Sequence, residues 1–217
     1  MKKQLDFYLN ISYETLATHN CIKNVNAIFP DANIFIDRNQ YFVYRPGDWV
    51  EPMGGNTNYP ALNLETGVKL IKSINDAIQE STAEYMMILE PDVLILERPK
   101  TFPKGAGGIL VNRLSAETIE GIERLYGFSQ DRYSMAGGSV IEVEQWKRRF
   151  NGYDIEDAGL LFQAWHEILY SDALLSVVLW KSGIEIQDWE ELCERFSSME
   201  RKLNASVVHG NKLFYNF

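Results

Sequence analysis

The stretch YMMILEPDVLIL, from Tyr85 to Leu96, decides the fold of this chain. It opens with a continuous apolar run, which is typical of a strand buried on both faces of a parallel sheet. Proline has no backbone N–H to donate to a strand ladder, so Pro91 predicts that the strand ends there. Glu90 and Asp92 then leave the sheet at its carboxyl edge, and VLIL predicts a short second strand.

Glu90 and Asp92 stand two residues apart, and in extended chain such side chains point the same way. Two carboxylates can therefore converge on one hard cation such as Mn²⁺ or Mg²⁺. The same spacing also fits a plain turn, in which Asp92 accepts hydrogen bonds from nearby backbone N–H groups. The spacing alone leaves both interpretations open.

Alternating strand and helix patterns precede this stretch. The expected elements are a strand over 5–11, a helix over 13–29, a strand over 33–36 and a helix from Leu64 to about Ile78. The last helix carries a clear apolar stripe at helical spacing. A β-α-β-α-β order implies parallel strands joined by right-handed crossovers. The fold class is therefore α/β, with a central, mostly parallel sheet flanked by helices.

The second half of the chain is more mixed. The expected elements are strands over 107–111 and 137–143, helices over 115–126 and 172–181, and a last helix that starts at Asp188. Glu191 stands three residues after Asp188, which is a capping-box pattern. We expect a single domain over residues 1–217, with a nucleotide-binding half at about 1–100 and an acceptor and donor-sugar half at about 101–217. Ligands of open α/β sheets bind at the carboxyl ends of the strands.

The composition of the chain limits the kinds of molecule that it can bind. The 217 residues carry 21 Lys and Arg against 30 Asp and Glu, a net charge of −9. This charge argues against a nucleic acid, which needs clustered cations, but a metal can supply the positive charge that a small phosphorylated ligand requires. Cys21 and Cys193 are far apart and predict reduced, buried thiols. The sequence shows no signal-peptide pattern and no apolar stretch long enough to span a membrane, so we expect a cytoplasmic protein.

The order of the motifs resembles the GT-A class of nucleotide-sugar glycosyltransferases. Residues 61–96 look like the helix, strand and metal motif of that class, and Gly137 and Gly138, the NGYD turn and SDALLSVVLWKSGIEI follow in its order. The likeness is to short soluble forms, similar to those with which microbes and large viruses decorate surface glycans. Two residues depart from the pattern: Glu90 replaces an Asp, and Ser171 stands where a Glu often precedes Asp172.

The resemblance implies a metal-dependent hexosyltransferase. Its donor would be a UDP-sugar, its metal Mn²⁺ or Mg²⁺, and its acceptor a glycan or glycoprotein hydroxyl. Asp92 would contact the metal directly, and Glu90 would be a direct or water-mediated ligand or a ribose contact. His209 would bind the same metal and Lys212 the diphosphate, although a surface histidine near the end of the chain is the ordinary alternative.

The resemblance and the sheet edge together give further candidates for the donor site. Ser12 and Tyr13 follow the first strand and would line the base pocket, while Ser12 also fits a helix cap. Asp37 would accept from the ribose or the base, or would simply start a turn. Gly137 and Gly138 resemble a turn of the donor and acceptor sites and are candidates for binding the donor.

Asp172 is the candidate general base if the reaction inverts configuration. It is also a good helix cap, and Asp157 is the second choice for the base. Two other functions stay open: a nucleotidyltransferase that makes sugar nucleotides, and a non-catalytic nucleotide- or carbohydrate-binding module. Nucleotidyltransferases usually carry a glycine-rich, basic loop after the first strand, and ISYETLATHN (residues 11–20) has no Gly, Lys or Arg.

Overall fold

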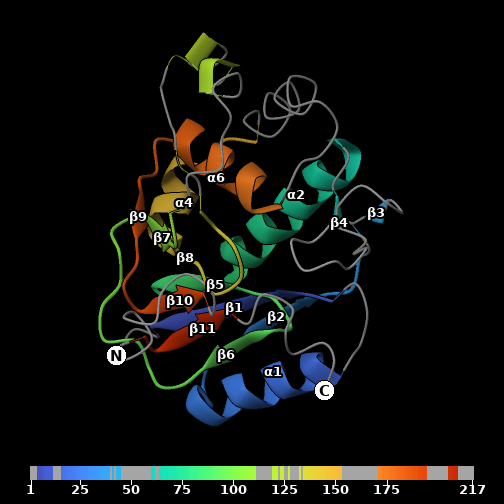
Figure 1. The fold of residues 1–217 in the computed structure, drawn as a ribbon, viewed down its shortest axis with the longest axis vertical. Helices are drawn as coiled ribbons and strands as arrows, with labels where there is room; N and C mark the ends of the chain where they lie inside the picture. The colour runs from blue at the N-terminus through green and yellow to red at the C-terminus, as the bar shows by residue number, and fades with distance from the viewer. Residues whose placement is uncertain are drawn as a thin grey trace, which may run out of the picture.

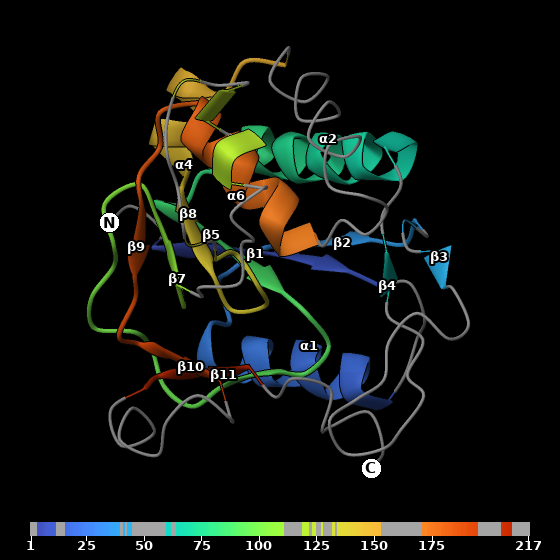
Figure 2. The ribbon, with the colours of Figure 1, turned by 45° about the horizontal axis from the view of Figure 1, so that its top comes forward.

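A computed structural model gives the fold. It describes residues 4–11, 16–39, 41, 43–44, 60–61, 64–110, 119–121, 123–124, 127, 132, 134–152, 171–194 and 205–209. A central sheet separates two layers (Figures 1 and 2). Helices α2, α4 and α6 cover one face, and helix α1 and a small three-stranded sheet lie on the other (Figure 2).

The central sheet has six strands. Their order is β2 (Ile34–Asp37), β1 (Leu5–Asn10), β5 (Tyr85–Leu89), β8 (Val140–Glu142), β7 (Ala106–Gly108) and β9 (Ile186–Asp188). Strand β1 pairs in parallel with β2 and β5, and β7 pairs in parallel with β9. Strand β8 runs antiparallel to both of its neighbours. The expected mostly parallel sheet, with YMMIL as an interior strand, is confirmed.

Two apolar clusters hold the helices to the sheet. The bounds are α1 (Leu16–Ile28), α2 (Leu64–Glu80), α4 (Val143–Arg149) and α6 (Ser171–Lys181). Met86 belongs to the cluster beneath α2, α4 and α6, whereas Met87 belongs to the cluster on the α1 side. Neighbouring strand residues point to opposite faces, so the continuous apolar run of β5 fills both clusters.

The chain leaves the central sheet immediately after β5. Strand β6 (Val93–Ile95) joins a second sheet, in the order β10 (Leu192–Glu194), β11 (Val207–His209), β6. The side-chain amide of Asn24 in α1 donates to the C=O of Ile95 and accepts from its N–H, each at 2.8 Å. The amide thereby fastens the outer edge of β6 to α1. Strands β3 (Val43–Tyr44) and β4 (Pro60–Ala61) form a third, two-stranded sheet.

Three expectations for the second half need correction. The strand expected over 107–111 is β7, which begins one residue earlier and is shorter. The strand expected over 137–143 is β8, which is also shorter, because Gly137 and Gly138 form a turn and Val143 starts α4. The helix expected from Asp188 is wrong, because Asp188 ends β9 and β10 follows. The Glu191 side chain bonds other segments instead of capping a helix.

The two other helices expected in the second half can be compared with the structure. Helix α6 matches its prediction to within one residue, and Gly183 follows it with φ of +66°. The helix expected over 115–126 lies mostly outside the described residues, of which 119–121 and 123–124 are helical. None of the helices in the described part of the chain combines the length and apolar character that a membrane crossing needs.

Candidate metal and donor site

The acidic stretch forms a tight turn at the carboxyl edge of the central sheet. Strand β5 ends at Leu89, Pro91 and Asp92 form the turn, and the N–H of Val93 donates to the carbonyl of Glu90 at 3.0 Å. The predicted end of the strand at Pro91 is confirmed. Both carboxylates therefore lie where α/β folds bind ligands.

Strand pairing adds His209 to this turn. Strand β11 runs antiparallel to β6 and places His209 opposite Val93, the neighbour of Asp92. The imidazole Nε2 lies 3.4 Å from Oε2 of Glu90 and 3.6 Å from Oδ1 of Asp92. One ligand atom from each of the three residues lies within 4.8 Å of the others. The structure thus brings together the three side chains expected at the metal, which we call the metal triad.

The metal triad is buried on one side and open on the other. The side chain of Asp92 is 0% exposed and that of His209 is 6% exposed, whereas that of Glu90 is 40% exposed. A cation among them would be held by protein on the inner side. Its outer side would stay accessible to a ligand that approaches past Glu90.

The donor set fits a hard divalent cation. Carboxylate oxygens suit Mg²⁺ and Mn²⁺, and imidazole suits the transition metals. Adjacent ligands of an octahedral ion with bonds of about 2.1 Å lie roughly 3 Å apart. The separations from His209 to Glu90 and to Asp92 exceed this value only slightly. The ligand atoms of all three residues lie within 4.8 Å of one another, so a closing movement would bring them onto one ion.

Gly137 supports Glu90 from the facing loop. Its backbone N–H donates to Oε1 of Glu90 at 3.1 Å. A Cβ at this position would come within 2.9 Å of the Glu90 Cβ and 3.0 Å of its Cγ. Only glycine leaves room for Glu90 here. The resemblance placed Gly137 at the donor site but gave no sign of this contact.

Gly138 has a different, local requirement. Its φ of +90° lies in the region that favours glycine, and its N–H donates to the carbonyl of Ile88 at 2.7 Å. A Cβ would also come within 2.6 Å of Leu192. Gly138 therefore fastens the loop to β5, and this positions Gly137 beside Glu90.

Cys21 lies beneath the turn. Its thiol donates to the carbonyl of Glu90 at 3.7 Å. Burial, with a contribution from the charge of Asp92, raises the pKa of Cys21 to about 12. The thiol therefore stays protonated at neutral pH in the metal-free protein. A cavity of about 210 Å³ lies between α1 and residues 91–94, and both Cys21 and Asp92 line it.

Comparison with known proteins identifies the fold. The sequence matches no protein-family model, and a comparison with curated protein sequences found no match. The structure is similar to that of a glycosyltransferase involved in the glycosylation of the major capsid of PBCV-1, with a TM-score of 0.52 and 10% sequence identity, over 95% of this chain and 92% of that chain. The chain has the GT-A glycosyltransferase fold.

A second solved structure, the galactosyltransferase LgtC in complex with donor and acceptor sugar analogs, aligns with a TM-score of 0.47 and 13% identity. That alignment covers 95% of this chain and 86% of LgtC. At such identities the likeness concerns the fold, so the chemistry of this GT-A chain has to be argued from its own residues.

Asp37 ends β2, at the same edge of the GT-A sheet. Its carboxylate accepts hydrogen bonds at 2.5–2.9 Å from Tyr8, Asn39, Tyr41 and Ser73. Burial alone would raise the pKa of Asp37, but the bonds from these residues outweigh it and hold the pKa below its ordinary value. Because these donors already occupy both oxygens, the arrangement favours the turn interpretation over a nucleotide contact.

Asp172 lies in the first turn of α6. One carboxylate oxygen accepts the N–H of Ala173 at 2.9 Å, and the side chain is half-buried. Ser176, one turn later, exchanges hydrogen bonds with both backbone groups of Ser134. Ser134 belongs to the loop that carries Gly137, so α6 is fastened to the loop beside the metal triad.

Four of the expected site residues lie outside the described residues. They are Ser12, Tyr13, Asp157 and Lys212.

Proposed function

We propose that this chain is a metal-dependent glycosyltransferase, which moves a sugar from a UDP-sugar to a hydroxyl of a glycan or protein-linked glycan. The observation that carries the proposal is the metal triad, in which Glu90, Asp92 and His209 meet at the carboxyl edge of a GT-A sheet. The expected ion is Mn²⁺ or Mg²⁺.

Each member of the metal triad has its own task in this proposal. Asp92 and His209 hold the ion from the buried side, and Glu90 completes the set on the open side. When bound, the ion neutralises the charge that develops on the departing nucleoside diphosphate. Lys212, three residues after His209, would add a second positive charge at the phosphates. These local positive charges would attract an anionic donor, although the chain as a whole carries a net charge of −9.

The nucleoside and the acceptor would take the neighbouring positions. Ser12 and Tyr13, which follow β1 in the chain, are the proposed contacts to the base. For an inverting reaction, Asp172 would take the proton of the acceptor hydroxyl as that oxygen bonds to the anomeric carbon and the bond from this carbon to the diphosphate breaks. Asp157 is the second candidate for this role.

Calorimetric titration of UDP with and without Mn²⁺ tests the proposal first. We expect binding that depends on the metal, and equal affinity without metal would contradict the proposal. Hydrolysis of UDP-sugars in the presence of Mn²⁺ is the second step. Metal-dependent UDP binding without hydrolysis or transfer would point to a binding module. Release of pyrophosphate from UTP and a sugar 1-phosphate would point to a nucleotidyltransferase.

A further inference from the structure

We propose that Glu191 is a positioning residue for the metal triad: it fixes β11 and the end of β6 at one end, and thereby holds His209 beside Asp92 at the other. The inference rests on the metal role in the proposed function. It assigns Glu191 no contact with the ion, the donor or the acceptor.

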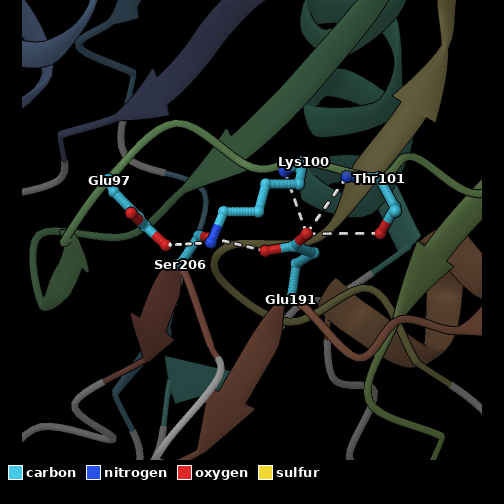
Figure 3. A network of polar contacts seen from close by, with 5 residues as sticks. All are labelled: Glu97, Lys100, Thr101, Glu191 and Ser206. Carbon is cyan, nitrogen blue, oxygen red and sulfur yellow. Dashed lines mark hydrogen bonds and ion pairs between the residues drawn. The ribbon is translucent and has the colours of Figure 1, made fainter.

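The Glu191 carboxylate is the centre of a buried network (Figure 3). Its Oε1 accepts the N–H groups of Lys100 at 2.9 Å and Thr101 at 3.0 Å, and the Thr101 hydroxyl at 3.3 Å. Its Oε2 accepts the hydroxyl of Ser206 at 2.5 Å. Glu191 is 7% exposed and Ser206 is fully buried. A single carboxylate therefore joins three segments that are distant in sequence.

Backbone bonds connect this network to the strands of the metal triad. The N–H of Val207 donates to the carbonyl of Glu191 at 2.9 Å, and the N–H of Leu96 donates to the carbonyl of Ser206 at 2.8 Å. Ser206 directly precedes β11 and Leu96 directly follows β6. The network thus fixes the end at which β11 begins and β6 stops.

The metal triad lies at the opposite end of the same strand pair. His209 is three residues after Ser206, which corresponds to about 10 Å of extended chain. In the observed register His209 pairs with Val93, immediately after Asp92. A slip of one residue would turn the His209 side chain to the other face of the sheet. Strands this short have few backbone bonds to set their register, so a side-chain anchor at one end matters more.

The charge of Glu191 suits this task. Burial alone would raise its pKa, but the hydrogen bonds from Ser206, Lys100 and Thr101 outweigh burial and lower the pKa. The group is therefore a carboxylate at neutral pH, and hydrogen bonds to a charged acceptor are stronger than those between neutral groups. The nearby ion pair between Lys100 and Glu97 is solvent-exposed, so it contributes little to the stability of the network.

A matched pair of serine variants tests the inference. Ser206→Ala removes a buried hydroxyl that donates to Glu191. Ser81→Ala removes a buried hydroxyl that donates to Asp6 at 2.8 Å and accepts the N–H of Ala83 at 3.1 Å. Asp6 lies near the start of β1, at the amino edge of the sheet. We expect both variants to lower the melting temperature, with a loss in Ser81→Ala at least as large as that in Ser206→Ala, because the Ser81 hydroxyl makes one more hydrogen bond. We also expect Ser206→Ala to weaken Mn²⁺ binding about tenfold, and Ser81→Ala to change it less than twofold.

Two further readouts separate positioning from general stability. Glu191→Gln keeps an oxygen for the N–H groups of the 100–101 segment and should bind Mn²⁺ more tightly than Glu191→Ala. In the metal-free protein, the imidazole resonances of His209, assigned by His209→Gln, should shift in Ser206→Ala and stay in place in Ser81→Ala.

The outcomes distinguish this inference from the proposed function. If the unchanged chain binds Mn²⁺ and Ser206→Ala binds it equally well, with His209 resonances in place, the positioning role is overturned and the metal site stands. If the unchanged chain does not bind Mn²⁺, the metal role falls and the positioning role with it. Ser206→Ala keeps the test decisive even if Glu191→Ala does not fold.

Discussion

Asp37 and Asp92 form an instructive contrast. Both are buried aspartates at the carboxyl edge of the same sheet, one at the end of β2 and the other after β5. The carboxylate of Asp37 is surrounded by donors, which are Tyr8, Asn39, Tyr41 and Ser73. Asp92 instead lies beside a second carboxylate, Glu90, and the imidazole of His209. Location alone does not identify a functional acid, whereas its neighbours do.

The physical difference is one of charge. Hydroxyl and amide donors stabilise the ionised form of Asp37, and these hydrogen bonds contribute directly to the stability of the folded protein. Two carboxylates at close range repel each other, and burial increases the cost. A cation bound between Glu90 and Asp92 reverses this repulsion. The contrast therefore predicts that variants at Asp37 change stability, whereas variants at the metal triad change metal affinity.

Asp92→Ala should have the largest effect on metal-dependent UDP binding, and Asp37→Asn is its control. We expect Asp92→Ala to weaken Mn²⁺-dependent UDP binding by at least about 100-fold, because the most deeply buried ligand is lost. Asp37→Asn should change the same affinity less than about threefold. Calorimetry on both folded variants makes the measurement. Equal losses in the two variants would show that the two carboxylates do not differ in role.

His209→Ala should have the next largest effect. It removes the nitrogen ligand and leaves both carboxylates in place, so we expect Mn²⁺ affinity to fall roughly tenfold to 100-fold, a range typical of groups that support a metal site. His19→Ala, on the exposed face of α1, is the control. Titration of Mn²⁺ followed by electron paramagnetic resonance makes the measurement, and unchanged affinity in His209→Ala would remove the histidine from the site.

Gly137→Ala sharpens the contrast further, since it acts on Glu90 without removing a ligand. The added Cβ would come within 3.0 Å of Glu90 atoms and displace that side chain from its present position. We expect about a tenfold loss of Mn²⁺ affinity. Gly121→Ala is the matched control, because a Cβ there meets no atom of the described residues within 4 Å. Similar affinities in the two alanine variants would show that the position of Glu90 is unimportant.

Asp37→Asn should have the smallest effect on the metal and a clear effect on stability. We expect a loss of about 1–3 kcal/mol at pH 7, typical of a buried hydrogen-bond set left partly unsatisfied. The folded pKa of Asp37 is lowered, so its contribution is present above the ordinary Asp pKa of about 3.9 and is lost as pH falls through the folded value.

Denaturant unfolding of the unchanged chain and Asp37→Asn, from pH 7 to pH 2.5, measures this dependence. The difference in unfolding free energy between the two proteins should shrink below about pH 4. A difference that stays constant over the whole range would mean that the charge of Asp37 contributes nothing.

The first hundred residues of the fold could largely be predicted from local patterns. The helical stripe of α2 and the apolar run of β5 are each contained in one segment, and their periods decide their structure. Pro91 ends the strand wherever the rest of the chain lies, so the position of Glu90 and Asp92 at the sheet edge also followed from sequence. The metal role of His209 came from resemblance, because its place beside Asp92 depends on the pairing of β11 with β6.

Errors arose where tertiary contacts outweigh a local pattern. Asp188 and Glu191 have the spacing of a capping box, but the carboxylate of Glu191 bonds the 100–101 segment and Ser206. The backbone there is a turn between β9 and β10. The hydroxyls around Asp37 come from three separate segments, and no spacing in the sequence connects them. The contact of Gly137 with Glu90 likewise joins two loops that only the folded sheet brings together.

An anomalous difference map tests the central claim most directly. Crystals of the unchanged chain grown with Mn²⁺ and UDP would be measured at the manganese absorption edge. We predict one strong peak about 2.2 Å from an oxygen of Asp92, an oxygen of Glu90 and the Nε2 of His209. A peak elsewhere, or no peak between these three side chains at saturating Mn²⁺, would contradict the account.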